Sequence, residues 1–506
     1  MAHPTSRRPG KVVPRLLAVL ALRLFAAGVW VAAVLLPARP RATIRPPEPV
    51  RFAELSPDGK TVATAPVGKV CGSIRLWDAV SGQERAVLRT RPLIAESCSF
   101  SPDNRFLVVQ DAKGNVNLWD VTTGREYASL PAVREAGGVS PFFHFSPDGR
   151  LLVYADPPKR VARLWDADAK TERALLGPNV VCVFGFSPDG RLLATRERNA
   201  ETSVSTMTVW NTTTGRPFRK FEVVTEHEDF TVAFAPDGKT LAAAFWQVRS
   251  HRPVTVSAEV MLWDLDAETL RAQLDCLEVG STFNLYRERL LTFSPNGRVL
   301  AFGAVAFWDV QVTPPRRLDV PPSTACMFSP DGKLLAVIEA PHTAGEPIVR
   351  LVGLDTAQVR TTVRGPTLET VLPHGRLLPV AFAPRDNLLL IGGCQQEQKG
   401  RFRTWLAGLF GLPGDRHVSI IQAYDTTTGH PRSRVRSPCT WSSAQLSNNG
   451  RTLLTCCADG TLQLWDLPPR RPWGRIVGYA AIAPAFLLGA SWLITRQRGV
   501  LCATTG

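Results

Sequence analysis

Short apolar runs recur along this chain, and polar turn sequences separate them. Leu151–Tyr154 and Leu334–Val337 are unbroken runs of this kind, which suit strands buried on both faces. A second kind of segment alternates apolar with polar residues and ends in Trp-Asp, as Val116–Asp120 and Leu462–Asp466 do. Both patterns have the length and composition of β-strands. The chain is therefore predicted to be an all-β protein.

A tight turn, Ser-Pro-Asp-Gly in its clearest form, precedes each apolar run. Proline presets φ for the first central position of such a turn, Asp bonds to its own backbone, and Gly adopts a positive φ at no steric cost. The turn or a variant of it occurs at Ser56–Gly59, Pro102–Asn104, Ser146–Gly149, Ser187–Gly190, Pro236–Gly238, Pro295–Gly297, Ser329–Gly332, Pro384–Asp386 and Asn448–Gly450. Nine such turns indicate nine structural repeats.

A second turn signal follows the Trp-Asp strands, as in Asp120–Gly124, Asn211–Gly215 and Asp425–Gly429. Each repeat thus contains a strand, the Pro-Asp-Gly turn, a buried strand, the Trp-Asp strand, a Thr-Gly turn and a final strand. A four-stranded unit that returns every 40–50 residues or so is typical of one blade of a β-propeller.

In these motifs the chain resembles the WD-repeat family, in the form common in bacterial proteins. The resemblance covers Ile44 to Leu467. The residues that match the Trp ending each repeat of the family are Trp77, Trp119, Trp165, Trp210, Trp263, Trp308 and Trp465, with Tyr424 and Gly353 in that place in weaker units. The family's Gly-His pair near the start of a repeat is missing, so its buried network of His, Ser/Thr, Asp and Trp is expected to be absent. The resemblance implies a propeller that offers its surface to other proteins.

The repeats predict a single closed propeller of eight or nine four-stranded blades, and we favour nine. The alternative is seven or eight regular blades with one degenerate unit packed outside. The sixth unit is short, with Gly303-Ala304 joining two strands, and the seventh lacks its Trp. The eighth carries an insertion, Gln395 to His417, in which basic residues precede an aromatic, apolar patch. This insertion suits either a loop in a membrane interface or a short helix folded back on the propeller.

Two apolar segments flank the repeats. Ile476 to Ile494 contains 19 uncharged residues, which is the length of a transmembrane helix, although a buried helix of a soluble domain is the alternative. Leu16 to Leu36 is interrupted by Arg23 and follows a basic stretch, as in a cleaved signal peptide or an uncleaved signal anchor. The expected organisation is a signal or anchor segment over 1–43, a propeller over 44–470, and a transmembrane helix with a short tail over 471–506.

Charge and cysteine content bear on the compartment. Basic residues are balanced on the two sides of the apolar segments, so they do not set the topology. Cys98, Cys326, Cys456 and Cys457 lie in strands like small apolar core residues, and their spacing indicates neither disulfides nor a zinc site. The signal-like N-terminus nevertheless favours a propeller on the exported side of a bacterial inner membrane.

No motif for catalysis, a cofactor or a metal is present, and no site residues are predicted. The eight His residues are scattered, and the repeated Asp residues of the turns are expected to make local hydrogen bonds. The net charge of +15 is spread in single Arg and Lys residues, so nucleic-acid binding is not expected. The sequence therefore favours a membrane-tethered, non-catalytic scaffold for other proteins, held by Ile476 to Ile494 and by Leu16 to Leu36 if that segment is retained. The alternative is an exported lactonase- or quinoprotein-like propeller enzyme with a site in the central channel.

Overall fold

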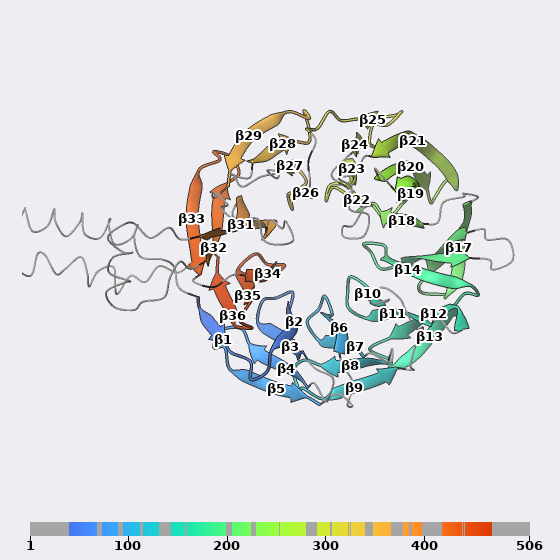
Figure 1. The fold of residues 1–506 in the computed structure, drawn as a ribbon. Helices are drawn as coiled ribbons and strands as arrows, with labels where there is room; N and C mark the ends of the chain where they lie inside the picture. Colours follow the sequence, from blue (N-terminus) through green and yellow to red (C-terminus); the bar gives the residue numbers. More distant parts are fainter. Residues whose placement is uncertain are drawn as a thin grey trace, which may run out of the picture.

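The computed structural model describes residues 40–467, apart from gaps at 68–72, 90–94, 112–114, 131–142, 157–158, 199–204, 224–228, 252–253, 280–290, 304–305, 322, 324, 340–347, 366–377, 384–386, 397–416, 438 and 440. The described part contains 36 β-strands and no α-helix. The strands form nine four-stranded antiparallel sheets, and Figure 1 shows these sheets arranged as the blades of one ring.

Each of the first eight blades takes its strands in chain order from the axis outward. Blades one to four are β2 (Val50–Leu55), β3 (Thr61–Pro66), β4 (Ile74–Asp78), β5 (Glu84–Leu88); β6 (Ala95–Phe100), β7 (Phe106–Asp111), β8 (Val116–Asp120), β9 (Glu126–Leu130); β10 (Phe143–Phe145), β11 (Leu151–Asp156), β12 (Val161–Asp166), β13 (Thr171–Leu176); and β14 (Val180–Phe186), β15 (Leu192–Arg198), β16 (Ser205–Asn211), β17 (Arg216–Val223). Blades five to eight are β18 (Asp229–Phe234), β19 (Thr240–His251), β20 (Val254–Asp264), β21 (Thr269–Val279); β22 (Leu291–Phe293), β23 (Val299–Phe302), β24 (Ala306–Asp309), β25 (Arg316–Arg317); β26 (Ala325–Phe328), β27 (Leu334–Glu339), β28 (Ile348–Gly353), β29 (Val359–Arg364); and β30 (Leu378–Ala383), β31 (Leu388–Gln396), β32 (His417–Asp425), β33 (Pro431–Ser437).

The ninth blade joins the two ends of the described chain. It contains β34 (Trp441–Leu446), β35 (Thr452–Cys457) and β36 (Leu462–Asp466), and its outermost strand is β1 (Ala42–Ile44). In the antiparallel pair of β1 and β36, Ala42 lies opposite Leu464. The sequence pattern did not predict this strand, whose three residues are too few to show an alternation. It closes the ring as part of the same sheet as β36.

Apolar residues of the strands pack between neighbouring blades. Nine buried clusters occur among the described residues, one at each of the nine interfaces between blades. At the interface of blades two and three, for example, Phe106 and Val108 of β7 lie in one cluster with Leu152 and Tyr154 of β11. The second strands are buried along their whole length in β11 and β35, as their unbroken apolar runs predicted.

The nine blades confirm the all-β fold and the single ring of nine. The expected transmembrane segments, Leu16 to Leu36 and Ile476 to Ile494, lie outside the described residues, as does the insertion over 397–416. Within the described part, there is no helix with the length and apolar character needed to span a bilayer.

The network of His, Ser/Thr, Asp and Trp was expected to be absent, but its contact between Trp and Thr is present in three blades. The indole N–H of Trp77, Trp210 and Trp465 donates to the hydroxyl of Thr64, Thr195 and Thr455, respectively, at 2.8 to 3.1 Å. In each case the Thr lies two residues beyond the residue that pairs with the Trp in the adjacent strand. The hydrogen bond between Trp and Thr does not involve a His. The absence of the Gly-His motif therefore could not be used to predict whether it forms.

The cysteine prediction was wrong for one pair. Cys439, which precedes β34, forms a disulfide with Cys457 at the end of β35, across a sequence separation of 18 residues. The two are brought together because β34 and β35 are antiparallel, with Trp441 opposite Cys457. Cys98 and Cys456 are free and buried, as predicted for small core residues.

Candidate interaction surface

The two faces of the ring differ in the lengths of their connections. Because neighbouring strands are antiparallel, the connections from first to second and from third to fourth strand emerge on one face, which we call the turn face. These connections contain four to six residues throughout. The other connections emerge on the opposite face, which we call the variable face, and contain from 2 residues, at 252–253, to 20 residues, at 397–416. Length variation is therefore confined to one side of the ring.

The turn face is built from a repeated hydrogen-bonding unit. In blade three, the Ser146 hydroxyl donates to Asp148 Oδ1 at 2.6 Å and accepts from the Leu151 N–H at 2.8 Å. Asp148 Oδ1 also accepts from the Arg150 N–H at 3.1 Å. Burial alone would raise the pKa of Asp148, but these bonds and the charge of Arg150 outweigh it and lower that pKa. The Asp148 carboxylate thus makes the local hydrogen bonds that the sequence predicted for the turn aspartates.

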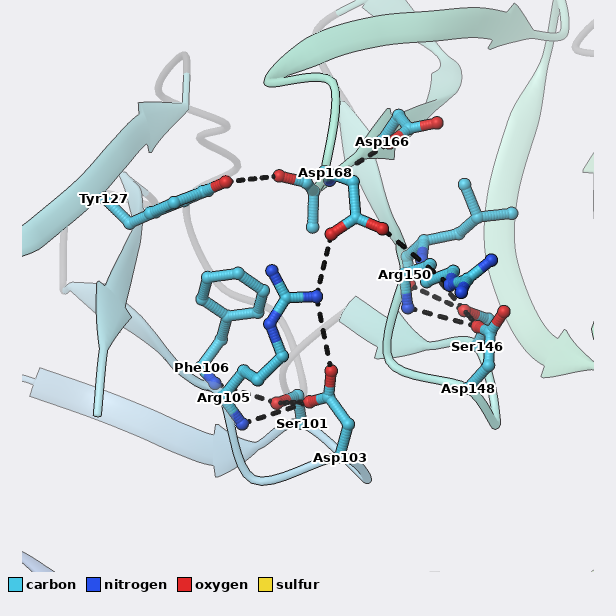
Figure 2. Close-up of polar contacts among 12 residues, drawn as sticks. Ser101, Asp103, Arg105, Phe106, Tyr127, Ser146, Asp148, Arg150, Asp166 and Asp168 are labelled. Atoms are coloured by element: carbon cyan, nitrogen blue, oxygen red, sulfur yellow. Dashed lines mark hydrogen bonds and ion pairs between the residues drawn. The ribbon is translucent and has the colours of Figure 1, made fainter. Parts of the chain in front are cut away.

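Neighbouring turns are also joined to each other. Figure 2 shows Arg105 of blade two between two carboxylates, with Nη1 2.7 Å from Asp168 of blade three and 3.8 Å from Asp103. Arg150 Nε approaches the other oxygen of Asp168 at 3.7 Å. The Tyr127 hydroxyl donates to the carbonyl of the residue before Asp168 at 2.8 Å. Most ion pairs of the turn face lie within one blade, as Arg150 with Asp168 does, whereas Arg105 and Arg219 pair with a carboxylate of the next blade.

The hydrogen bond from Tyr127 to a carbonyl of the next blade has counterparts elsewhere in the ring. Arg41 beside β1 donates to the Ala79 carbonyl of blade one at 2.6 Å, and Arg271 of β21 donates to the Val310 carbonyl of blade six at 2.8 Å. In both cases the acceptor directly follows the Asp that ends the third strand of the next blade, as it does for Tyr127. A long side chain on the outermost strand thus fastens one blade to the next.

The variable face carries a group of three exposed cations on blades three and four. We call Lys159, Arg160 and Arg198 the cationic patch. The Val180 N–H donates to the Arg160 carbonyl at 2.9 Å, and the Arg198 N–H donates to the Asn179 carbonyl at 2.9 Å. These bonds tie the connection between the two blades to both sides of the patch.

The backbone beneath the cationic patch has an uncommon conformation. Arg160 has a φ of 52° and Asn179 a φ of 70°, and residues other than Gly rarely occupy this region. The nearby carboxylates are already paired: Asp156 with Arg163 at 2.9 Å and Glu197 with the Lys220 ammonium at 3.6 Å. The patch therefore presents positive charge on a backbone shaped by local hydrogen bonds, which suits an acidic group on a partner.

The innermost strands carry polar groups that join blades. Gln445 of β34 accepts from the Leu55 N–H at 2.9 Å and donates to the Ala53 carbonyl at 3.1 Å. Burial raises the pKa of Glu54, although hydrogen bonds from the Ser99 hydroxyl and the Phe100 N–H act against it. These side chains link blade nine to blade one and blade one to blade two, so their first role is structural.

No candidate metal or catalytic centre emerges from the described residues. They contain no group of three His, Cys, Asp or Glu side chains placed to hold a metal ion. The His residues among them, at 144, 251, 417 and 430, belong to blades three, five and eight rather than to one site. The cationic patch was missed by the sequence analysis because Arg198 is 38 residues from Arg160 and no motif connects them.

Comparison with known proteins agrees with this architecture. The WD40 family model, described as WD domain, G-beta repeat, matches residues 422–466, which run from β32 of blade eight through β36 of blade nine. No curated protein matches the sequence.

Several solved structures resemble the ring. A crystal structure of the eukaryotic initiation factor has a TM-score of 0.53 at 15% identity and covers 78% of this chain and 89% of its own. The computationally designed Ika8 protein has a TM-score of 0.46 at 14% identity, covering 85% of this chain and 99% of its own. Hydrazine synthase of Kuenenia stuttgartiensis has a TM-score of 0.38 at 16% identity, covering 64% of this chain and 98% of its own. At 15% identity the first likeness shows a shared fold alone. The function has to be argued from the residues of the site.

Proposed function

This chain is a WD-repeat β-propeller protein, and on that premise we propose that it is a non-catalytic scaffold, tethered at a bacterial inner membrane, that binds other proteins through its variable face. The observation that carries the proposal is the difference between the two faces. Connections that vary in length and sequence are where a rigid scaffold places its binding residues. The turn face has connections of nearly uniform length, and its charged groups are mostly paired within their own blade.

Binding through the variable face is tested by charge reversal with a matched control. The test variant is Lys159→Glu, Arg160→Glu and Arg198→Glu in one chain, which reverses the cationic patch. The control is Arg191→Glu, Lys333→Glu and Arg451→Glu, three exposed cations of the turn face. Both variants change the net charge by the same amount.

Proteins would be captured with each full-length variant from solubilised membranes and quantified by mass spectrometry. We expect partners retained by the parent to be lost from the patch variant and kept by the control. Equal recovery with both variants, or selective loss with the turn-face variant, would contradict binding at the patch.

Export and tethering are supported by two features. Nineteen uncharged residues at Ile476 to Ile494 suit a membrane-spanning helix, and an exposed segment of this kind in water would promote aggregation. The disulfide of Cys439 with Cys457 favours an oxidising compartment, since cytosolic thiols are kept reduced. Together they support a propeller on the exported side of the membrane.

Tethering is tested by truncation and fractionation. The full-length protein should resist carbonate extraction of membranes, because a spanning helix stays in the bilayer and a peripheral contact does not. Deletion of Trp473 to Gly506 should release the protein if the N-terminal segment is cleaved. If Leu16 to Leu36 is an anchor, both ends must be removed. Extraction of the full-length protein by carbonate would refute the tether.

The alternative function is an exported propeller enzyme of the lactonase or quinoprotein type. Such a site needs carboxylate, His or Asn side chains from several blades that converge near the axis. Three polar groups of the inner strands, Glu54, Ser99 and Gln445, are instead engaged between blades, and for this reason we favour the scaffold.

A further inference from the structure

The outermost strands of the ring differ in charge from one side to the other. The outer strands β25, β29 and β33 of blades six to eight contain arginines and no acidic residue. The outer strands β5, β9 and β13 of blades one to three each contain a glutamate. We call the β29 and β33 surface the arginine edge. Its arginines are Arg360, Arg364, Arg432, Arg434 and Arg436.

Four of these arginines, Arg360 and Arg364 on β29 and Arg432 and Arg434 on β33, are exposed. On β29, Arg364 is exposed while Val363 is buried, and on β33, Arg434 is exposed while Val435 is buried. Two nearby aspartates offset part of the charge, because Asp355 pairs with Arg360 and Asp425 with Arg432. By sequence, the five arginines and these two aspartates sum to a formal charge of +3.

The arginine edge lies beside the place where both ends of the described chain leave the ring. The Arg41 N–H donates to the Leu464 carbonyl at 2.6 Å, so both chain ends lie together on blade nine. Blade eight adjoins this blade, since the Trp441 N–H donates to the Ser419 hydroxyl at 2.9 Å. Figure 1 shows β29, β33 and the strands of blade nine along the same side of the ring.

The two connections from blade nine to the apolar segments are short. Only five residues lie between Leu36 and Ala42, and eight lie between Leu467 and Ile476. Even fully extended, such connections reach only about 20 Å and about 30 Å. A bilayer that holds either segment is therefore within that distance of blade nine, and blades seven and eight are its neighbours.

We propose that the arginine edge rests on anionic phospholipid headgroups, so that the propeller is oriented at the membrane and not only anchored to it. The proposal depends on the tether argued above. Each arginine close to an anionic leaflet raises the equilibrium constant for membrane contact by about fivefold. The attraction falls off within a Debye length and is weakened by salt. Blades one to three, with a glutamate on each outer strand, lack this preference.

The test is amide hydrogen exchange of the full-length protein in nanodiscs. One set of discs contains phosphatidylcholine alone, and the other contains phosphatidylglycerol in addition. The exchange rate of peptides covering β29 and β33 should be lower by about threefold or more in the anionic discs, because headgroups cover the edge. Peptides covering β9 and β13 should exchange equally in both.

Matched variants separate lipid contact from a general change in stability. Arg364→Gln with Arg434→Gln should abolish the difference between the discs, as should high salt. Arg125→Gln with Arg173→Gln, in blades two and three, should leave it intact. Equal exchange of β29 and β33 in both kinds of disc would overturn the lipid contact while leaving the tether in place.

Two further outcomes also decide the question. If added DNA or an acidic polypeptide slows the exchange of β29 and β33 more than anionic lipid does, the edge serves a macromolecular partner and the proposal is wrong. If the protein is not retained in discs of either composition, the tether itself is contradicted and the lipid contact falls with it.

Discussion

At the scale of single residues, the Trp that ends each repeat shows how local register sets a contact. Thr64, Thr195 and Thr455 supply a hydroxyl to the indole of their blade. In blade two, Leu107 pairs with Trp119, so the equivalent position is Val109. Trp119 Nε1 is buried without a hydrogen-bond partner there. An unpaired buried donor costs free energy that an added hydroxyl can recover.

We expect Thr195→Val to lower the free energy of unfolding by about 1–3 kcal/mol, because it leaves the indole N–H of Trp210 buried and unpaired. Val109→Thr should raise the melting temperature by giving Trp119 its missing acceptor. The control is Val108→Thr, which buries a hydroxyl on the opposite face of the same strand and should be destabilising. A Thr195→Val protein as stable as the parent would show that the pair is unimportant.

The turn glycines allow a second comparison. Gly149 and Gly190 have φ values of 75° and 72°, so any side chain strains both by about the same amount. A Cβ at Gly149 would lie 2.5 Å from Asp103 Cγ, whereas one at Gly190 would be 3.7 Å from its nearest neighbour. Asp103 cannot easily move, because Ser101 and Arg105 hold its carboxylate.

We therefore expect Gly149→Ala to lower the melting temperature clearly more than Gly190→Ala does. The strain at positive φ should cost about 1 kcal/mol or more in both variants, with the steric conflict added only at Gly149. Thermal unfolding followed by circular dichroism measures the difference. Equal losses would mean that Asp103, which Figure 2 shows in its contact with Arg105, can move aside for the added methyl group.

At the scale of elements, the repeats predicted most of the strands and turns because each blade repeats one local pattern. The positions of the Trp-Asp strands and of the Pro-Asp-Gly turns were confirmed, apart from the turn at Pro384–Asp386, which lies outside the described residues. Closure by β1 was missed because three residues carry too little pattern. The disulfide was missed because Cys439 meets Cys457 only through the pairing of β34 with β35.

The disulfide should stabilise the closing blade by restricting the unfolded chain. For a loop of 18 residues this contribution is about 3 kcal/mol. Cys439→Ser with Cys457→Ser should therefore lower the melting temperature, and a reductant should lower that of the parent to a similar value. Cys182→Ser, which replaces a partly exposed thiol that is in no disulfide, is the control and should have little effect. If the reductant leaves the melting temperature of the parent protein unchanged, the disulfide does not stabilise the closing blade.

At the scale of the whole molecule, the ring separates its tasks by surface. The turn face holds the blades together, the variable face offers connections of unequal length, and blade nine carries both chain ends. None of this separation could be predicted from single motifs. The cationic patch, for instance, combines residues of two blades, and only the hydrogen bonds of Asn179 and Val180 bring them together.

Lysines on the two faces provide the most direct test of partner binding through the variable face. Lys60, Lys170, Lys239 and Lys333 lie in connections of the turn face, and Lys159 lies in a connection of the variable face. Lys69, Lys113 and Lys399 lie outside the described residues and are counted with Lys159 because, in the sequence, each falls between the second and third strands of a blade. Amine-reactive cross-linking of intact membranes, with the linked peptides identified by mass spectrometry, samples both groups in one experiment. We predict that links to other proteins fall on the variable-face lysines. Links concentrated on the turn-face lysines, or divided evenly between the two groups, would contradict the account.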